Sequence, residues 1–296
     1  MNRRSRATPD CPSSFGARIA RSAASVLGVL FATGVLLGSP ARAAEGPLEL
    51  DLAVQPVLSP EATHERYQPL ADHLSLVTGY RIRLVTSPNF VAYWQGMLRL
   101  DRAPDLVLDA SHFTGYRVEY MGFEVLARIP DKVSYSLVTR DDDLVMEINE
   151  IIAEPIASFS SPGMGAVLLD AMFPNVIRKP VVTDIASTEE AVQALREGRV
   201  RAAFIPSRLV NVFPGLFVVA STAQHSAPAL SASPGVPIEA RARLREALLN
   251  MTHTLAGREA LQQSAIDRFE LATPDEYTPD AAMLVAYWPL GPHRNR

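Results

Sequence analysis

Three segments between residues 67 and 110 read Tyr67-Gln-Pro-Leu-Ala-Asp-His-Leu, Thr78-Gly-Tyr-Arg-Ile-Arg-Leu-Val and Pro104-Asp-Leu-Val-Leu-Asp-Ala. They predict a helix that ends at Gly79, a strand, a second helix that begins at Asn89, and another strand. An apolar run at residues 48–57 precedes them and predicts a further strand. Strands that alternate with helices at this spacing are typical of an α/β domain with a parallel sheet, which binds ligands beyond the carboxyl ends of its strands.

The rest of the chain predicts a second set of elements that mirrors the first. We expect helices at 111–121, 144–152, 165–173 and 188–197, strands at 134–139, 156–159, 180–183 and 201–205, and one long amphipathic helix at 238–264. The arginines of that last helix are expected to form a solvated face. Two similar sets of strands and helices predict two lobes.

The N-terminus has the features of an export signal. Five arginines between Arg3 and Arg21 precede an apolar run at 23–37, and Ala41-Arg-Ala43 follows with small residues at the positions that a signal peptidase reads. The run is shorter than the ~20 residues that a membrane-spanning helix needs. We therefore predict a signal peptide over residues 1–43, cleaved at Ala43 or Ala44, and a mature protein in the periplasm.

Cleavage would change the charge and the cysteine content. Six of the 28 basic residues and one of the 32 acidic residues lie in residues 1–43, so the mature chain carries a formal net charge of −9. A negative protein is a poor partner for nucleic acid or for an anionic membrane. Cys11 is the only cysteine and lies in the same segment, so the mature chain has no disulfide and no thiolate ligand.

Sequence motifs for catalysis are absent. The chain has no G-x-S-x-G, H-E-x-x-H, P-loop or complete G-x-G-x-x-G motif, and its six histidines lack metal-ligand spacing. Asp105 and Asp109 flank one predicted strand and could form a carboxylate pair, but no base or nucleophile accompanies them. We predict that the protein is not an enzyme and needs no cofactor.

The strongest candidate site is the segment Ser158-Phe-Ser-Ser-Pro-Gly-Met-Gly-Ala-Val, which joins a strand to a helix. N–H groups at a helix start favour an anion, and the hydroxyls of Ser160 and Ser161 can add donors. A serine helix cap with flexible glycines is the alternative interpretation. His112 is a second candidate because it follows the carboxyl end of a strand, although a buried structural histidine explains it equally well.

These features together resemble the phosphonate/phosphate-type periplasmic substrate-binding proteins, the solute receptors of ABC importers. The resemblance also rests on Ser226-Ala-Pro-Ala-Leu, on a C-terminal helix pair at 247–261 and on Ile266-Asp-Arg-Phe, and it covers residues 48 to about 280. It implies a two-lobed type-2 periplasmic binding fold of the α/β class, with a hinge and an interlobe ligand cleft. Lobe 1 would comprise residues 44–132 and 232–296, and lobe 2 residues 133–231.

The resemblance implies a set of ligand-binding residues as well. Gln55 leaves the first strand where the family's opening loop does, and Tyr93 lies in the helix that contributes an aromatic ring there. The full predicted set is Gln55, Tyr93, Asp109, His112, Ser160, Ser161, Gly163, Met164, Gly165 and Thr188.

The chain departs from the family at the anion-binding positions. Residues 162–164 (Pro-Gly-Met) stand where the family has hydroxyl side chains, Thr188 replaces a histidine, and Arg201 replaces an acid. Each lost donor to a buried oxygen costs about 1 kcal/mol, so we expect simple alkylphosphonates to bind weakly unless Arg201 compensates. A smaller or less charged anion, or a ligand with an apolar part beside Met164, is expected instead.

The expected partners are a small oxyanion and an inner-membrane ABC permease, with the protein itself a monomer. Two other interpretations stay open. The chain can be a periplasmic sensing subunit that presents its closed form to a histidine kinase or another signalling receptor. A metal receptor that uses His112 and Met164 would need a larger cluster of soft ligands.

Overall fold

The computed structural model describes residues 46–99 and 103–285. The predicted signal peptide and Cys11 lie outside these ranges. Within the two ranges, every helix is too short or too polar to span a bilayer.

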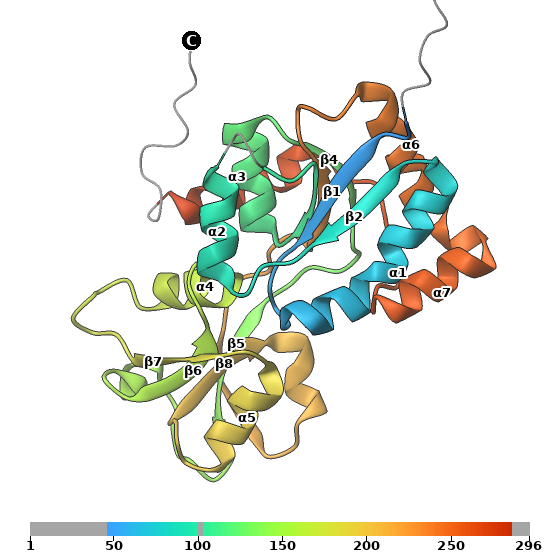
Figure 1. Ribbon diagram of the computed structural model, residues 1–296. Helices are drawn as coiled ribbons and strands as arrows, with labels where there is room; N and C mark the ends of the chain where they lie inside the picture. The colour runs from blue at the N-terminus through green and yellow to red at the C-terminus, as the bar shows by residue number, and fades with distance from the viewer. Residues whose placement is uncertain (1–45, 100–102, 286–296) are drawn as a thin grey trace, which may run out of the picture. The chain divides into compact units, whose positions relative to one another are not determined.

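The first of two sheets is built from both ends of the described chain (Figure 1). Its strands, in spatial order, are β2 (Arg81–Val85), β1 (Glu49–Val54), β3 (Leu106–Asp109), β10 (Ala229–Ala232) and β4 (Glu124–Arg128). β1 runs parallel to β2 and β3, whereas β10 runs antiparallel to β3 and β4. The parallel arrangement predicted from the strand and helix spacing is confirmed.

The second sheet follows the same plan. Its strands, in spatial order, are β7 (Val181–Ile185), β6 (Pro155–Phe159), β8 (Ala202–Pro206), β5 (Tyr135–Arg140) and β9 (Leu216–Ser221). β6 is parallel to β7 and β8, and β5 is antiparallel to β8 and β9. We call the first sheet with its helices lobe 1 and the second sheet with its helices lobe 2.

The helices begin and end largely where local chemistry predicts. They are α1 (Pro60–Thr78), α2 (Phe90–Leu98), α3 (Ser111–Met121), α4 (Met164–Met172), α5 (Thr188–Arg196), α6 (Ile238–Leu249), α7 (Leu255–Gln263) and α8 (Thr278–Ala281). Gly79 ends α1 in the left-handed conformation, with φ of 75°. The side chain of Asn89 caps α2 by accepting from the N–H of Ala92 at 2.8 Å.

The prediction of a helix at 144–152 is wrong, because only a 3₁₀ turn forms in that segment, at Ile148–Ile151. Asp143 does not cap a helix; it accepts from the side chains of Arg140 and Arg201 instead. The carboxylate of Glu150 takes the N–H of Glu147, and this capping box starts the turn four residues later than predicted.

The prediction of one long helix at 238–264 is also wrong, because the segment forms two helices, α6 and α7. The helix pair that the family resemblance implies there is confirmed. Thr254 begins α7 by accepting from the N–H of Gly257 at 3.0 Å. A side chain at Gly257 would collide with the carbonyl oxygen of Met251, so the glycine permits the tight connection between the two helices.

The arginines of α6 form the expected solvated face only in part, because Arg243 is exposed whereas Arg241 and Arg245 are half-buried. Arg241 and Arg245 both pair with Glu124 at the start of β4, with Arg241 at 2.9 Å. Arg243 lies over the ring of Tyr80 at 5.9 Å. These contacts fix α6 to the sheet through charge as well as through its apolar stripe.

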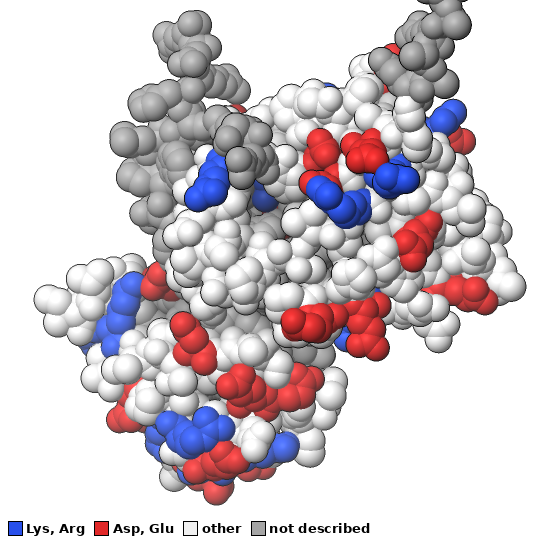
Figure 2. Space-filling view, viewed as in Figure 1, with Lys and Arg blue, Asp and Glu red and all other residues white. Residues whose placement is uncertain are grey.

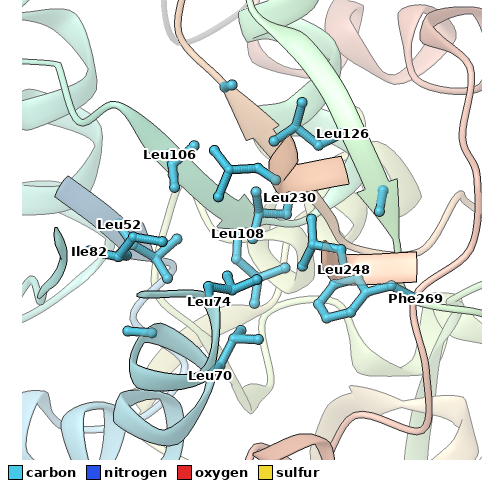
Figure 3. Close-up of a cluster of buried hydrophobic side chains, with 14 of the residues drawn as sticks. Leu52, Leu70, Leu74, Ile82, Leu106, Leu108, Leu126, Leu230, Leu248 and Phe269 are labelled. Carbon is cyan, nitrogen blue, oxygen red and sulfur yellow. The ribbon is translucent and has the colours of Figure 1, made fainter. Parts of the chain in front are cut away.

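Alternating side chains of the central strands supply the core of lobe 1. Leu106 and Leu108 of β3 point to the face covered by α1, α6 and α7, where they meet Leu52, Leu74 and Leu230 (Figure 3). Val107 points to the other face, where the aromatic residues of α2 and α3 pack. The described residues contain no cysteine, so burial of these side chains is the main source of stability.

Charges on the surface of lobe 1 are interspersed rather than separated. Figure 2 shows acidic and basic side chains side by side over β1 and β2, where Glu49 pairs with Arg81 and Asp51 with Arg83, each at 2.8 Å. Exposed pairs of this kind contribute little to stability, typically about 0–1 kcal/mol. They make this face of lobe 1 a poor attractor for a charged ligand.

Candidate functional site

The carboxyl ends of β1 and β3 bring two predicted residues together. The side-chain oxygen of Gln55 accepts from the N–H of Ala110 at 3.1 Å, and the backbone N–H of Gln55 donates to the carbonyl of Leu108 at 3.1 Å. Gln55 therefore lies beside Asp109, at the strand edge where this fold class binds ligands.

Asp109 is fully buried, and donors occupy both of its carboxylate oxygens. Tyr93 donates to Oδ2 at 2.7 Å, Thr114 to Oδ1 at 2.9 Å, and Arg117 Nε to Oδ2 at 3.2 Å. Burial raises the pKa of Asp109, and the charge of Arg117 and these hydrogen bonds oppose that rise. Arg117 is itself 1% exposed, so this buried ion pair joins α2, α3 and β3.

His112 connects the two lobes. Its Nε2 lies 2.9 Å from the carbonyl oxygen of Pro162, and because a carbonyl only accepts, Nε2 must carry the proton. The side chain is 0% exposed, and burial lowers the pKa of His112 to about 4, although the bond to Pro162 and the charge of Asp280 act in the opposite direction. The imidazole is neutral at pH 7 and holds the loop before α4 against α3.

The loop at residues 160–163 presents the start of α4. The N–H of Gly163 donates to the carbonyl of Ser160 at 2.9 Å, which forms a tight turn, and the Ser161–Pro162 peptide bond is cis. Among the described residues, the N–H groups of Met164, Gly165 and Ala166 meet no acceptor. Ser161 is exposed and Ser160 is half-buried, and both precede these N–H groups in the same loop.

Two glycines let side chains approach this loop closely. A Cβ at Gly163 would lie 2.9 Å from the carbonyl oxygen of Ser160 and 3.0 Å from the ring of Phe90, which belongs to lobe 1. A Cβ at Gly165 would lie 3.3 Å from the ring of Tyr135. Phe90 and Tyr135 therefore lie next to the start of α4, and any larger residue at 163 would push Phe90 away.

Three residues that the sequence placed at or near the site are buried or ion-paired in the structure. Met164 is 4% exposed and packs in the lobe 2 core with Leu137 and Phe204, so it offers no surface to the apolar part of a ligand. Thr188 is buried at the start of α5, and no hydrogen bond between described residues joins it to residues 160–165. Arg201 pairs with Asp143 at 2.8 Å at the amino end of β8, so it does not compensate for the lost donors.

The segments that cross between the lobes are hydrogen-bonded to each other. The chain leaves lobe 1 after β4 and returns before β10, and Val133 and His225 exchange two backbone hydrogen bonds where these passages meet. Nδ1 of His225 lies 2.9 Å from Asp280, which also accepts from the hydroxyl of Ser111. The C-terminal segment thus joins the crossing to the start of α3.

The positions of Arg117, Tyr135 and Asp280 near the site were not predicted from the sequence. Arg117 had a usable signal, because it follows Phe113 by four residues and so shares the buried face of α3. Asp280 had none, since its partner Ser111 lies 169 positions away.

We predict that acidification lowers the free energy of unfolding of the wild-type protein through His112. The pKa of His112 is about 4 in the folded state and ordinarily 6.5, so the stability that its neutral form contributes is complete above pH 6.5 and is lost as the pH falls toward 4. Between pH 7.5 and 5, wild type should lose about 2 kcal/mol more unfolding free energy than His112→Gln, whose amide can still donate to Pro162. Urea unfolding at both pH values measures this, and equal losses in the two proteins would contradict it.

Comparison with known proteins gives a family and a fold for the chain. A family model described as an ABC transporter, phosphonate, periplasmic substrate-binding protein matches residues 52–277. The search of curated proteins gave no match.

Solved structures show the same fold at low sequence identity. PhnD1 of Prochlorococcus marinus in complex with methylphosphonate has a TM-score of 0.68 and 14% identity, over 82% of this chain and 100% of its own. XAC2383 of Xanthomonas citri bound to ATP has a TM-score of 0.67 and 14% identity, over 81% of this chain and 98% of its own. A binding protein component of an ABC phosphonate transporter from Pseudomonas aeruginosa has a TM-score of 0.66 and 13% identity, over 82% of this chain and 87% of its own.

Proposed function

The chain belongs to the periplasmic substrate-binding proteins of phosphonate ABC transporters, and from this membership we propose that it binds a small oxyanion between its lobes as a monomer. Proteins of this family bind a solute and deliver it to a membrane permease, and they do no chemistry on it. The family favours that importer role over the sensing role. We also propose that residues 1–43 are the export signal.

One observation carries the proposed ligand class. The N–H groups of Met164, Gly165 and Ala166 meet no acceptor among the described residues, at the carboxyl edge of the lobe 2 sheet. A helix of nine residues begins there, so its dipole adds to their attraction for negative charge. Ser160 and Ser161 are the side-chain donors we assign to the ligand.

The buried residues of the predicted set have a different role in this proposal. Asp109 accepts hydrogen bonds from Tyr93 and Arg117. The side-chain oxygen of Gln55 accepts from the backbone N–H of Ala110. We propose that they position α3, so that His112 can hold Pro162 in the closed form. Closure about the crossing segments would bury the ligand and create the surface that the permease reads.

We propose the predicted lobe boundaries with one adjustment. In this proposal the first crossing is near residue 133 and the return is before Ala229 rather than at residue 232. The adjustment is supported by the pairing of the whole of β10 with β3 and β4.

Native mass spectrometry of protein released gently from the periplasm tests the function. A bound small molecule that carries negative charge is the expected result. Release of a neutral solute would reject the oxyanion, and the absence of any small molecule together with no thermal stabilisation by inorganic phosphate would count against this site.

We predict that Ser161→Ala weakens binding of the retained anion by about 1–2 kcal/mol, because a buried oxygen of the anion loses one donor. Ser187→Ala is the matched control, since Ser187 also precedes a helix but its hydroxyl is used by the N–H of Glu190 at 3.1 Å. Calorimetry should show reduced affinity only for Ser161→Ala. Unchanged affinity in that variant would remove Ser161 from the site.

A further inference from the structure

Arg208 lies at the same sheet edge as the start of α4. β6 and β8 are parallel neighbours, so their carboxyl ends face the same way. α4 follows the loop after β6, and a 3₁₀ turn at Ser207–Val212 follows β8 directly. The fold thus brings Arg208 and residues 160–165 to one edge of lobe 2, although they are distant in sequence.

A serine network fixes the backbone beside Arg208. The N–H of Ser207 donates to the carbonyl of Ser134 at 2.8 Å, and its hydroxyl lies 2.8 Å from that of Ser136. Ser136 lies 2.8 Å from the hydroxyl of Ser221 and is 2% exposed. The turn is therefore anchored to β5 and β9, and the side chain of Arg208 is exposed to solvent.

The guanidinium of Arg208 makes no hydrogen bond or ion pair with any other described residue. The arginines at the opposite edge of the same sheet differ, because Arg140 and Arg201 both pair with Asp143. An exposed, unpaired cation on a protein of net negative charge is available to an anionic ligand.

Two tyrosines, one from each lobe, are close enough to Arg208 to sense its charge. Burial raises the pKa of Tyr67 in α1 and raises the pKa of Tyr135 in β5 to about 12, and in both the charge of Arg208 acts in the opposite direction. Neither phenol hydroxyl forms a hydrogen bond with another described residue. Figure 1 shows the start of α1 beside the turn that follows β8. Arg208 therefore lies between the lobes, with two unused hydroxyls near it.

We propose that Arg208 is the cationic anchor for the oxyanion head of the ligand, with Tyr135 and Tyr67 as flanking hydroxyls from the two lobes. This inference rests on the proposed function. The planar guanidinium can donate two parallel hydrogen bonds to a carboxylate, phosphate or phosphonate. It supplies a full charge where Pro162, Gly163 and Met164 have replaced hydroxyl donors, so the ligand must carry at least one full negative charge.

Calorimetry with three anions tests the proposal: succinate, inorganic phosphate and methylphosphonate. Their neutral counterparts, succinamide and dimethyl methylphosphonate, serve as ligand controls. Wild type should bind at least one anion, and Arg208→Gln should bind it about tenfold to a hundredfold more weakly. Arg208→Lys should recover part of the affinity, because it restores the charge without the planar fork.

Arg199→Gln is the matched protein control. It removes the same charge from the amino end of the same strand, where Arg199 pairs with Glu197. It should bind the anion as wild type does, and both variants should keep the wild-type melting temperature within a few degrees. The anion that binds best, a carboxylate or a phosphorus oxyanion, identifies the head group.

Each remaining outcome would overturn the inference. Equal affinity of Arg208→Gln and wild type for the anion would reject Arg208 as the anchor but would leave the proposed binding function intact. Tighter binding of a neutral counterpart than of its anion would reject an anionic ligand. Failure of all three anions to bind wild type rejects the anchor, while native mass spectrometry decides the binding function separately. Unchanged binding with reduced cellular uptake would assign Arg208 to the permease contact instead.

Discussion

Replacing Asp109 with asparagine should lower the free energy of unfolding by about 3–5 kcal/mol. Arg117 is 1% exposed and cannot lose its proton, so the variant leaves a buried cation without a counter-charge. Tyr93 and Thr114 would also lose a charged acceptor. Urea unfolding at pH 7 measures the loss.

An exposed pair in the same sheet is the control. Asp51 accepts two hydrogen bonds from Arg83, whose side chain is 73% exposed, so Asp51→Asn should cost less than about 1 kcal/mol. Adding Arg117→Met to Asp109→Asn should restore stability, because the unpaired charge is then gone. Similar losses of unfolding free energy in Asp109→Asn and Asp51→Asn would show that loss of the buried counter-charge is not the source of the cost.

Gly115→Ala should destabilise the protein by about 1–3 kcal/mol or more through overpacking. A Cβ there would collide with the carbonyl oxygen of Tyr277 and lie 3.0 Å from the N–H of Ala281. The obstacle is backbone, so α8 must move away from α3 rather than adjust a rotamer. Displacement of α8 would also draw Asp280 away from its partners at the crossing.

Gly96→Ala provides the opposite expectation for the same substitution. Gly96 lies inside α2, and a Cβ there meets nothing within 4 Å. Alanine should therefore stabilise the protein by about 0.5–1 kcal/mol. Thermal unfolding of the two variants distinguishes them, and equal effects would show that α8 does not pack against Gly115 in solution.

Local chemistry explains why the element boundaries were largely predictable. Gly79 and Asn89 act on their own backbone neighbours, and the continuous apolar run in β3 reports a sheet with two covered faces. The two failures at the C-terminal helices have different causes. Thr254 ends the apolar stripe by a local cap on the N–H of Gly257, which the apolar spacing alone does not report. The partner of Arg241 is Glu124, 117 positions away, and a single sequence does not report that contact.

The candidate site divides in the same way. The strand ends that carry Gln55, Asp109 and His112 follow from topology, which the sequence pattern predicts. Their surroundings do not follow, because the burial of Asp109 depends on Arg117 and that of His112 on Pro162. Met164 was assigned to the site by its position alone, whereas its side chain points into the lobe 2 core.

The place of β10 in the lobe 1 sheet has a consequence for how the chain acquires its structure. β10 lies between β3 and β4, so β4 has no neighbour in the sheet until residues 229–232 are available. All of lobe 2 lies in the sequence between them. Closing so long a loop costs entropy before any pairing repays it. The nascent or translocating chain must therefore keep the edge of β4 unpaired until lobe 2 has emerged, and chaperone protection during biogenesis would be needed most at that stage.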